Sequence, residues 1–232
     1  MSKQARSVLQ MGDIVQKMSK KQTIFADICK ERCKVLQSTV EVLSRGGVVA
    51  LPTDTVYGLI TLYSHSQQLL DVKKRDPKKP IGLFFANPEL IFDYTYPTVD
   101  KELLYKLLPG RVTLLLQRLP SFPSHFIYEN DLLGVRVPDN AFIREVCTEF
   151  DEPIAQTSAN TSGNASSTQP EEFEELWESI DLVLHDKESC SKGRVGSTII
   201  DLSEKGYYSI VREGCIREHC ERILIDHGLK QK

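Results

Sequence analysis

Short apolar runs that end in polar residues recur along the chain and constrain its fold more than any other feature. In "PIAQTSANTSG" (153–163) an apolar opening leads into hydroxyl and amide side chains, and "VVALPTDTVYGLI" (48–60) follows the same pattern. In open α/β sheets, ligands bind beyond the carboxyl ends of the strands. The pattern predicts buried strands whose ends line a cavity. Taken alone, "PIAQTSANTSG" fits a Ser/Asn turn with a helix cap better.

Strand-like and helix-like segments alternate, but several strands follow one another without a crossover helix. This favours an α/β fold with a mixed parallel and antiparallel sheet over a purely parallel one. No repeat or linker divides the chain, so we expect one domain over residues 25–228, preceded by a flexible arm over residues 1–24. Helices are expected at 25–45, 66–74, 100–108, 140–150, 170–180 and about 217–227.

Composition excludes several classes of protein. With 41% hydrophobic and 26% charged residues, the chain is typical of a globular protein. Its net charge of −3 argues against a protein that binds nucleic acid over its whole surface. No apolar run approaches the roughly 18 residues of a membrane span. The six cysteines form no CxxC pair, which favours a reducing, cytoplasmic compartment. The N-terminal arm is rich in Lys and Arg, so a mitochondrial fraction stays open.

The segment "KKRDPKK" (73–79) places five cations, Lys73, Lys74, Arg75, Lys78 and Lys79, in seven residues. The Asp-Pro step stops a helix there and holds the cations on a turn. A turn of this kind converges point charges and a planar guanidinium on a polyphosphate. A solvated helix end explains the same charges, and both interpretations stay open.

Two arginines stand in or at the end of apolar strands. Arg136 lies between two valines in "GVRVPD", and Arg212 lies at a strand end in "VREGC" beside Gly214, where a ligand could approach the backbone closely. An arginine at the sheet edge or surface needs no partner, and this interpretation stays open. A buried arginine requires an anionic partner, and in a cavity that partner could be a ligand carboxylate. Ser197 in "GSTIID" has no nearby base in the sequence that would make it a nucleophile.

The sequence lacks the motifs of the common catalytic classes. There is no HExxH, GxSxG, GxGxxG or GxxxxGK[ST]. What remains is a set of hydroxyls, an amide and several cations, which suits phosphoryl or nucleotidyl transfer by positioning and electrostatics. A module that binds anions or RNA would use the same residues.

Seven blocks resemble, in order, the signature blocks of the YrdC family, over roughly residues 35–215. Each is modest alone, but seven in order are highly specific. The helix "PEEFEELW" is similar to that of the animal-type member. The blocks are "ALPTDTVYGL" (50–59), "KKRDPKKP" (73–80), "LPGRVTLLL" (108–116), "VRVPD" (135–139), "PIAQTSANTSG" (153–163), "GSTIID" (196–201) and "IVREG" (210–214).

The resemblance implies an L-threonylcarbamoyl-AMP synthase, a nucleotidyltransferase that uses L-threonine, bicarbonate and ATP with Mg²⁺. A separate complex then moves the threonylcarbamoyl group onto the adenosine beside the anticodon of tRNA. The implied fold is a twisted mixed sheet with flanking helices and a basic concave cavity. The chain ends soon after "REG" and so resembles the short, single-domain form. The loop "HDKESCSKGRVG" (185–196) is the segment that we expect to serve as a lid.

The resemblance also assigns roles to residues, with no protein metal ligand among them. It implies threonine contacts in the blocks around residues 55 and 136, and catalytic and phosphate contacts in the cationic turn. The threonine set is Thr55, Tyr57, Arg136 and Ser158; the catalytic pair is Lys73 and Arg75; and the ATP set is Lys73, Arg75, Lys79, Asn160, Thr168, Ser197 and Arg212.

The sequence departs from the family pattern at three positions. Arg111 replaces the second proline of a Pro-Gly-Pro block, Gln156 stands where a small or apolar residue is common, and Phe84 stands where some members place a His near threonine. Two other functions compete with the synthase: an RNA-binding translation module that uses the same cavity, and a carbamoyl-phosphate-linked transferase domain. Absence of aromatic residues around "KKRDPKK" weighs against the RNA module.

Overall fold

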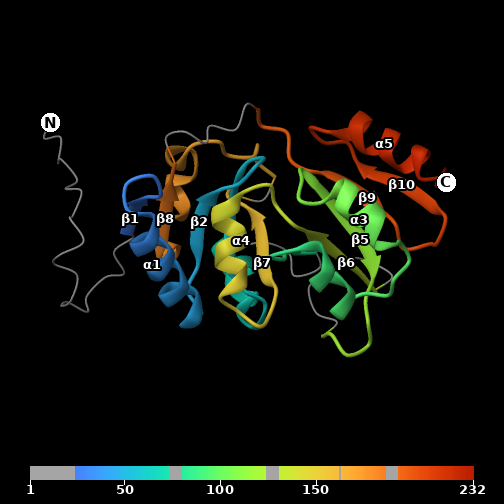
Figure 1. Cartoon of the computed structure of the whole chain (residues 1–232). Coiled ribbons are helices and arrows are strands. Elements are labelled where there is room, and N and C mark those ends of the chain that lie inside the picture. The colour runs from blue at the N-terminus through green and yellow to red at the C-terminus, as the bar shows by residue number, and fades with distance from the viewer. Residues whose placement is uncertain (1–23, 74–79, 124–130, 162, 187–192) are drawn as a thin grey trace, which may run out of the picture.

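The protein folds around one mixed sheet. The computed structural model describes residues 24–73, 80–123, 131–161, 163–186 and 193–232. In this part of the chain eleven strands form a sheet in the order β1-β8-β2-β3-β7-β4-β6-β5-β9-β10-β11 (Figure 1). The strands are β1 (Ile24–Asp27), β2 (Val49–Pro52), β3 (Tyr57–Leu62), β4 (Gly82–Phe84), β5 (Val112–Gln117), β6 (Leu132–Arg136), β7 (Ile154–Ser158), β8 (Leu182–His185), β9 (Thr198–Asp201), β10 (Tyr207–Arg212) and β11 (Lys230–Gln231).

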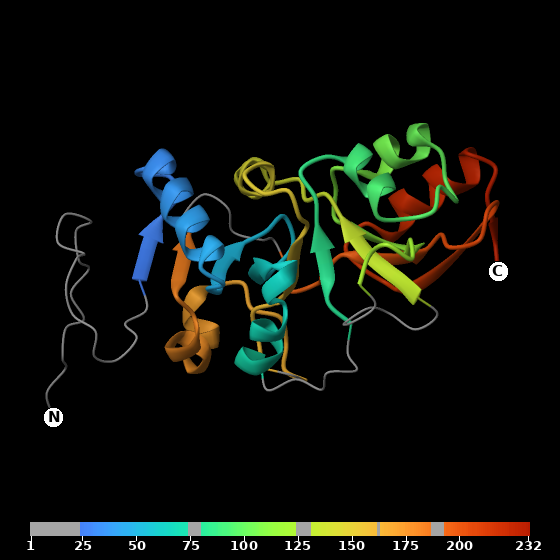
Figure 2. The ribbon, with the colours of Figure 1, turned by 90° about the horizontal axis from the view of Figure 1, so that it is seen from below.

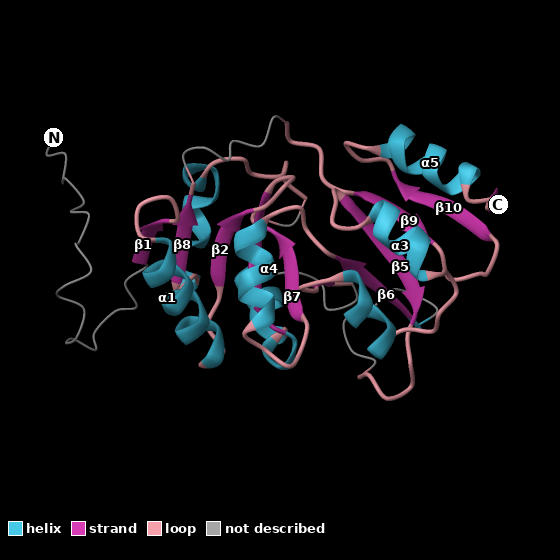
Figure 3. Cartoon of the chain, in the orientation of Figure 1, coloured by secondary structure: helices cyan, strands magenta, loops and turns pink. Residues whose placement is uncertain are grey.

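Helices cover the sheet at several places (Figure 3). None of those in the described ranges is long and apolar enough to cross a membrane. The α-helices are α1 (Arg32–Ser44), α2 (Gln67–Lys73), α3 (Lys101–Leu107), α4 (Ala141–Thr148) and α5 (Arg217–Asp226), and the 3-10 helices include η1 (Tyr63–His65), η2 (Pro88–Asp93) and η4 (Pro170–Ser179).

The strand pairing confirms the expected mixed sheet. Strand β7 runs antiparallel to both β3 and β4, whereas β4 runs parallel to β6. Strand β5 pairs antiparallel with β6 and parallel with β9. Several chain-adjacent strands pair directly, as β2 and β3 do, and such direct connections require antiparallel neighbours.

Two helix pairs cover opposite faces of the sheet. Phe84 packs in a core cluster with α1 and α4, whereas its neighbour Leu83 packs in the cluster that holds α3 and α5. Successive strand residues point to opposite faces, so the two clusters lie on the two sides of β4. Figures 1 and 2 show α1 and α4 over the N-terminal half of the sheet and α3 and α5 over β5, β9 and β10. The face covered by α1 and α4 continues across β6, β5 and β9 and carries the functional cavity there.

The structure corrects three sequence predictions. Residues 24–27 form β1, parallel to β8, so the helix expected over 25–45 begins only at Arg32, and residue 24 belongs to the sheet and not to the arm. "VVALPTDTVYGLI" is two antiparallel strands joined by a turn over 53–56. The segment from Pro170 is a 3-10 helix with a break at Phe173, whose ring is fully buried. We attribute the break to the burial of this ring, which the regular helical pattern of the sequence does not predict.

Candidate functional site

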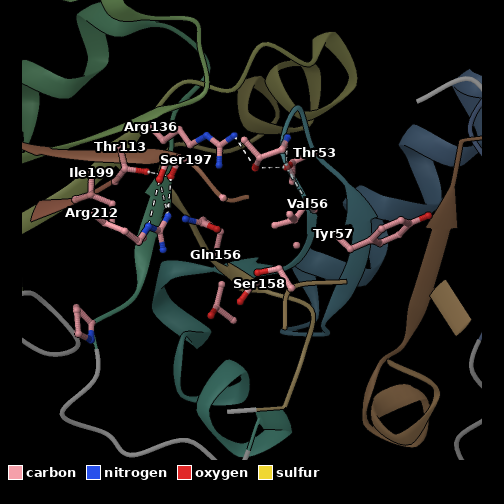
Figure 4. A pocket seen from close by; sticks show the side chains of 17 residues that line it. Thr53, Val56, Tyr57, Thr113, Arg136, Gln156, Ser158, Ser197, Ile199 and Arg212 are labelled. Carbon is pink, nitrogen blue, oxygen red and sulfur yellow. Dashed lines mark hydrogen bonds between the residues drawn. The ribbon is translucent and has the colours of Figure 1, made fainter. Parts of the chain in front are cut away.

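One cavity of about 190 Å³ brings together several polar residues that the sequence singled out, namely Thr55, Arg136, Gln156, Ser158, Ser197 and Arg212 (Figure 4). It lies beyond the β2–β3 turn and over the ends of β6, β7 and β9. Its wall contains no His, Cys, Asp or Glu side chain within the described residues. The lining residues are Thr53, Thr55, Val56, Tyr57, Gly58, Pro80, Gly82, Thr113, Arg136, Gln156, Thr157, Ser158, Ser166, Gly196, Ser197, Ile199 and Arg212.

The β2–β3 turn presents two buried hydroxyls in fixed orientations. Thr53 Oγ1 donates to the carbonyl of Val56 at 2.7 Å and accepts from the backbone N–H of Thr55 at 3.0 Å. The proton of Thr53 is therefore used, and Thr55 Oγ1, 3.1 Å away, donates to Thr53 Oγ1. Thr55 Oγ1 in turn accepts from Arg136 Nη2 at 3.1 Å. The remaining capacity of Thr55 is thus as an acceptor, for a ligand hydroxyl or amine.

Arg136 is buried at the end of β6 and forms an ion pair with Asp54. The second carboxylate oxygen of Asp54 accepts from the backbone N–H of Asp139 at 3.0 Å. Burial lowers the pKa of Arg136, and the charge of Asp54 opposes this effect. Arg136 Nε is buried without a hydrogen-bond partner in the described part of the chain. Asp54, which was not among the predicted site residues, thus holds the arginine at the cavity.

Phe84 supports the same arginine. The guanidinium carbon of Arg136 lies 5.6 Å from the centre of the Phe84 ring, and the ring is fully buried. A guanidinium at this distance from an aromatic face is attracted by the ring quadrupole. Where some family members place a polar side chain, this protein has an apolar support for Arg136.

Lys73 ends α2 and is buried, with its ammonium among polar atoms of the β7 end. Lys73 Nζ donates to the carbonyl of Ser158 at 2.6 Å and lies 3.3 Å from the hydroxyls of Thr157 and Ser158. Asn160 Oδ1 lies 3.5 Å away. The predicted threonine residue Ser158 and the predicted phosphate residues Lys73 and Asn160 therefore meet at one place. Arg75 and Lys79 lie outside the described residues.

Ser197 and Arg212 form a second polar group across the cavity. Arg212 donates to the carbonyl of Ser197 through Nε at 3.2 Å and Nη2 at 2.8 Å, and Ser197 Oγ lies 2.8 Å from Thr113 Oγ1. No described residue accepts a hydrogen bond from Arg212 Nη1, which leaves it available to a ligand anion. Gly214 lies against the chain itself, since a Cβ there would meet Thr198 N at 2.1 Å. This contact within the chain accounts for the glycine, and the approach of a ligand to Gly214 stays a prediction.

Two predicted residues point elsewhere. The Tyr57 ring packs on Phe173, with ring centres 5.4 Å apart, and points away from the other lining side chains, so only its backbone borders the cavity (Figure 4). Thr168 donates to Glu172 through its backbone at 2.9 Å and its hydroxyl at 3.3 Å, and it is not part of the cavity wall. Asn160 is buried beside Lys73 but is also outside the wall.

Thr113 and Ser166 also line the cavity and were not predicted from the sequence. Thr113 carries a usable signal, because it is the polar residue in the apolar run "VTLLL", and strand alternation turns it away from Val112 and Leu114. Ser166 comes from a loop whose position no local pattern predicts. Arg111 is exposed, and its carbonyl accepts from Thr198 N at 3.1 Å.

The family model Sua5/YciO/YrdC, described as telomere recombination, matches residues 41–214. The chain belongs to this family. It is 37% identical over 204 residues to the threonylcarbamoyl-AMP synthase of Bos taurus, covering 84% of this chain and 74% of the relative. The threonylcarbamoyl-AMP synthase of Rattus norvegicus is 39% identical over 199 residues, covering 82% and 71%.

A solved structure shares the fold of this family member. The crystal structure of P. abyssi Sua5 complexed with L-threonine matches with a TM-score of 0.77 and 24% identity. The match covers 90% of this chain and 63% of the Sua5 chain, so this chain spans less than two thirds of that structural relative. The likeness shows the fold.

An ion pair joins η4 to the loop before β9 and gives a testable pH dependence. Glu172 accepts from Arg194 at 2.7 and 2.8 Å, and this interaction, followed by the N–H of Thr168, lowers the pKa of Glu172. A lowered folded-state pKa contributes stability above the ordinary carboxyl pKa, and that stability is lost as the pH falls. We expect Glu172→Gln to lower the free energy of unfolding by at most about 1 kcal/mol near neutral pH.

Urea unfolding of both proteins across the acid range measures this effect. The difference between wild type and Glu172→Gln is expected to shrink as the pH falls through the folded-state pKa of Glu172. A difference that stays constant with pH would show that the charge of Glu172 contributes nothing to stability.

Proposed function

We propose that this protein is an L-threonylcarbamoyl-AMP synthase, a nucleotidyltransferase that makes threonylcarbamoyl-AMP and pyrophosphate from L-threonine, bicarbonate and ATP. The observation that carries the proposal is the composition of the cavity wall: two arginines and several hydroxyls, with no described His, Cys, Asp or Glu. Such a wall binds anions and stabilises developing negative charge, but it offers no nucleophile–base pair. Family membership and the names of the curated relatives support the same reaction.

The chemistry then proceeds between the substrates. The amine of threonine attacks the carbon of bicarbonate, water leaves, and a carbamate forms. A carbamate oxygen attacks the α-phosphorus of ATP, and the bond to pyrophosphate breaks. Arg136 pairs with the threonine carboxylate, whereas Lys73 and Arg212 stabilise the charge on the phosphates. Holding the reactants in line supplies much of the rate enhancement, since positioned reactants have high effective molarities.

Mg²⁺ enters this proposal as part of the ATP substrate. In the described ranges no three His, Cys, Asp or Glu side chains converge to hold a metal ion. Asp54, the carboxylate beside the cavity, is already bound by Arg136 and by the N–H of Asp139. The phosphate oxygens are therefore the ligands that we assign to the ion, and its chemistry is to neutralise charge on the leaving pyrophosphate.

The product is a mixed anhydride that requires an acceptor. We assign that step to a separate tRNA-modifying complex, met transiently, which transfers the threonylcarbamoyl group to the adenosine beside the anticodon. The cytoplasm is the compartment we assign, with a mitochondrial fraction if the basic N-terminal arm directs import.

Substrate selectivity tests the assignment of the threonine pocket. The acceptor position on Thr55 and the hydroxyl of Ser158 suit a substrate hydroxyl, so we expect kcat/KM to fall in the order threonine, serine, valine. Loss of the substrate methyl costs about 1–3 kcal/mol, whereas valine leaves buried hydroxyls unpaired and loses roughly 10⁴-fold. Competition assays that rank valine above serine would remove Thr55 and Ser158 from this role.

A further inference from the structure

Gln156 lines the cavity, but the proposed reaction assigns it no role. It lies on β7 two residues before Ser158, and strand alternation turns both side chains to the same face of the sheet. Both residues line the cavity. Figure 4 shows the Gln156 side chain between Ser158 on one side and Ser197 and Arg212 on the other. It thus stands between the predicted threonine contacts and the predicted nucleotide contacts.

The sheet provides a niche for this amide. Gly82 on β4 is the direct antiparallel partner of Gln156. A Cβ at Gly82 would lie 2.2 Å from Gln156 Nε2, far inside van der Waals contact. The glutamine can keep this orientation only because residue 82 has no side chain.

The amide has no internal partner. No described residue donates to or accepts a hydrogen bond from the side chain of Gln156, which is half-buried and faces the cavity. A half-buried amide with two donors and an acceptor is costly to leave unpaired, and it gains most from a charged partner. Arg136 and Arg212 both border the same space and draw anionic groups into it.

From this placement we infer that Gln156 is a specificity-determining contact for the α-phosphate of the nucleotide, donating from its amide N–H groups to the non-bridging oxygens on the phosphorus that the carbamate attacks. The inference rests on the proposed function. It concerns the reacting phosphate and not the nucleoside, because Ser197 and Arg212 lie on one side of the amide and Ser158 on the other. A neutral donor at this point adds a hydrogen bond without adding further charge beside two arginines.

Calorimetry with AMP, adenosine and L-threonine as separate probes tests the inference. Gln156→Leu keeps the side-chain volume and removes both polar atoms, and we expect AMP affinity to fall about tenfold or more, as for hydrogen bonds to charged groups. Affinities for adenosine and threonine should stay within about twofold of the wild-type values, because a change of that size is too small to reflect a lost contact. Gln37→Leu, at an exposed α1 position, is the matched control and should change none of them.

A second variant separates a contact from a structural role. Gln156→Glu keeps the shape but places a carboxylate beside the phosphate, so its AMP affinity and turnover should both rise as the pH falls through the carboxyl pKa. Gly82→Ala should reproduce the loss of AMP affinity by displacing the amide.

The possible outcomes distinguish failure of the Gln156 contact from failure of the proposed function. Unchanged AMP affinity in Gln156→Leu, or an equal loss for adenosine, would overturn the phosphate contact. A pH-independent defect in Gln156→Glu would do the same. Wild-type protein that binds AMP but makes no threonylcarbamoyl-AMP would instead overturn the proposed function and leave the Gln156 contact standing.

Discussion

Replacing Arg136 by Ala is expected to abolish measurable threonine binding and to lower the free energy of unfolding by about 3–5 kcal/mol. Both effects follow from the buried ion pair. The substrate carboxylate loses its cationic partner, and the Asp54 carboxylate stays buried beside the N–H of Asp139 without its arginine. Calorimetry with L-threonine and with ATP, together with urea unfolding, measures the two consequences separately.

The double variant Asp54→Ala/Arg136→Ala is the matched control. It removes both charges, so stability should recover relative to Arg136→Ala, whereas threonine binding should stay lost. ATP should bind both variants more nearly as it binds wild type. Threonine affinity that returns with stability in the double variant would mean that Arg136 serves the fold alone.

Replacing Lys73 by Met is expected to lower the rate of pyrophosphate release by about 10²–10³-fold, the usual cost of losing one preorganised charge donor. The ammonium touches the carbonyl and hydroxyl of Ser158 and lies near Asn160, so its removal withdraws a positive charge from the point where the two predicted substrate sites meet. Met keeps the apolar stem of the side chain in place. Circular dichroism and an assay of pyrophosphate release report fold and turnover.

The double variant Lys73→Ala/Arg75→Ala separates the synthase from an RNA-binding module. The synthase predicts loss of pyrophosphate release with the fold retained. Full turnover combined with lost RNA retention would favour the binding module.

Much of the fold was predictable because strand and helix patterns in this chain are regular. "LLGVRVPD" and "PIAQTSANTSG" gave the strands β6 and β7, with their polar ends at a cavity. The segment 24–31 was not predictable as strand and turn, because β1 depends on pairing with β8, more than 150 residues away in the chain. Local periodicity contains no information on such a partner.

The site was predictable to the level of its motifs but not of its contacts. The sequence indicated that Arg136 needs an anionic partner, yet only the fold shows that Asp54 supplies it within the protein. The direction of the Tyr57 ring could not be predicted either, because its packing partner Phe173 belongs to η4, which is far from Tyr57 in the sequence. Gln156 stood out as a departure from the family pattern, and its meaning depends on Gly82 across the strand pair.

Incubation of the pure full-length protein with ATP, bicarbonate and labelled L-threonine tests the central claim most directly. We expect the label to appear in an adenylated threonine adduct, with one pyrophosphate released for each adduct formed. Formation of both products should require threonine and bicarbonate together. In a buffer without the tRNA acceptor, the adduct should hydrolyse and release the label. Pyrophosphate release that is independent of threonine, or the absence of any labelled adduct from folded protein that binds both ATP and threonine, would contradict the assignment.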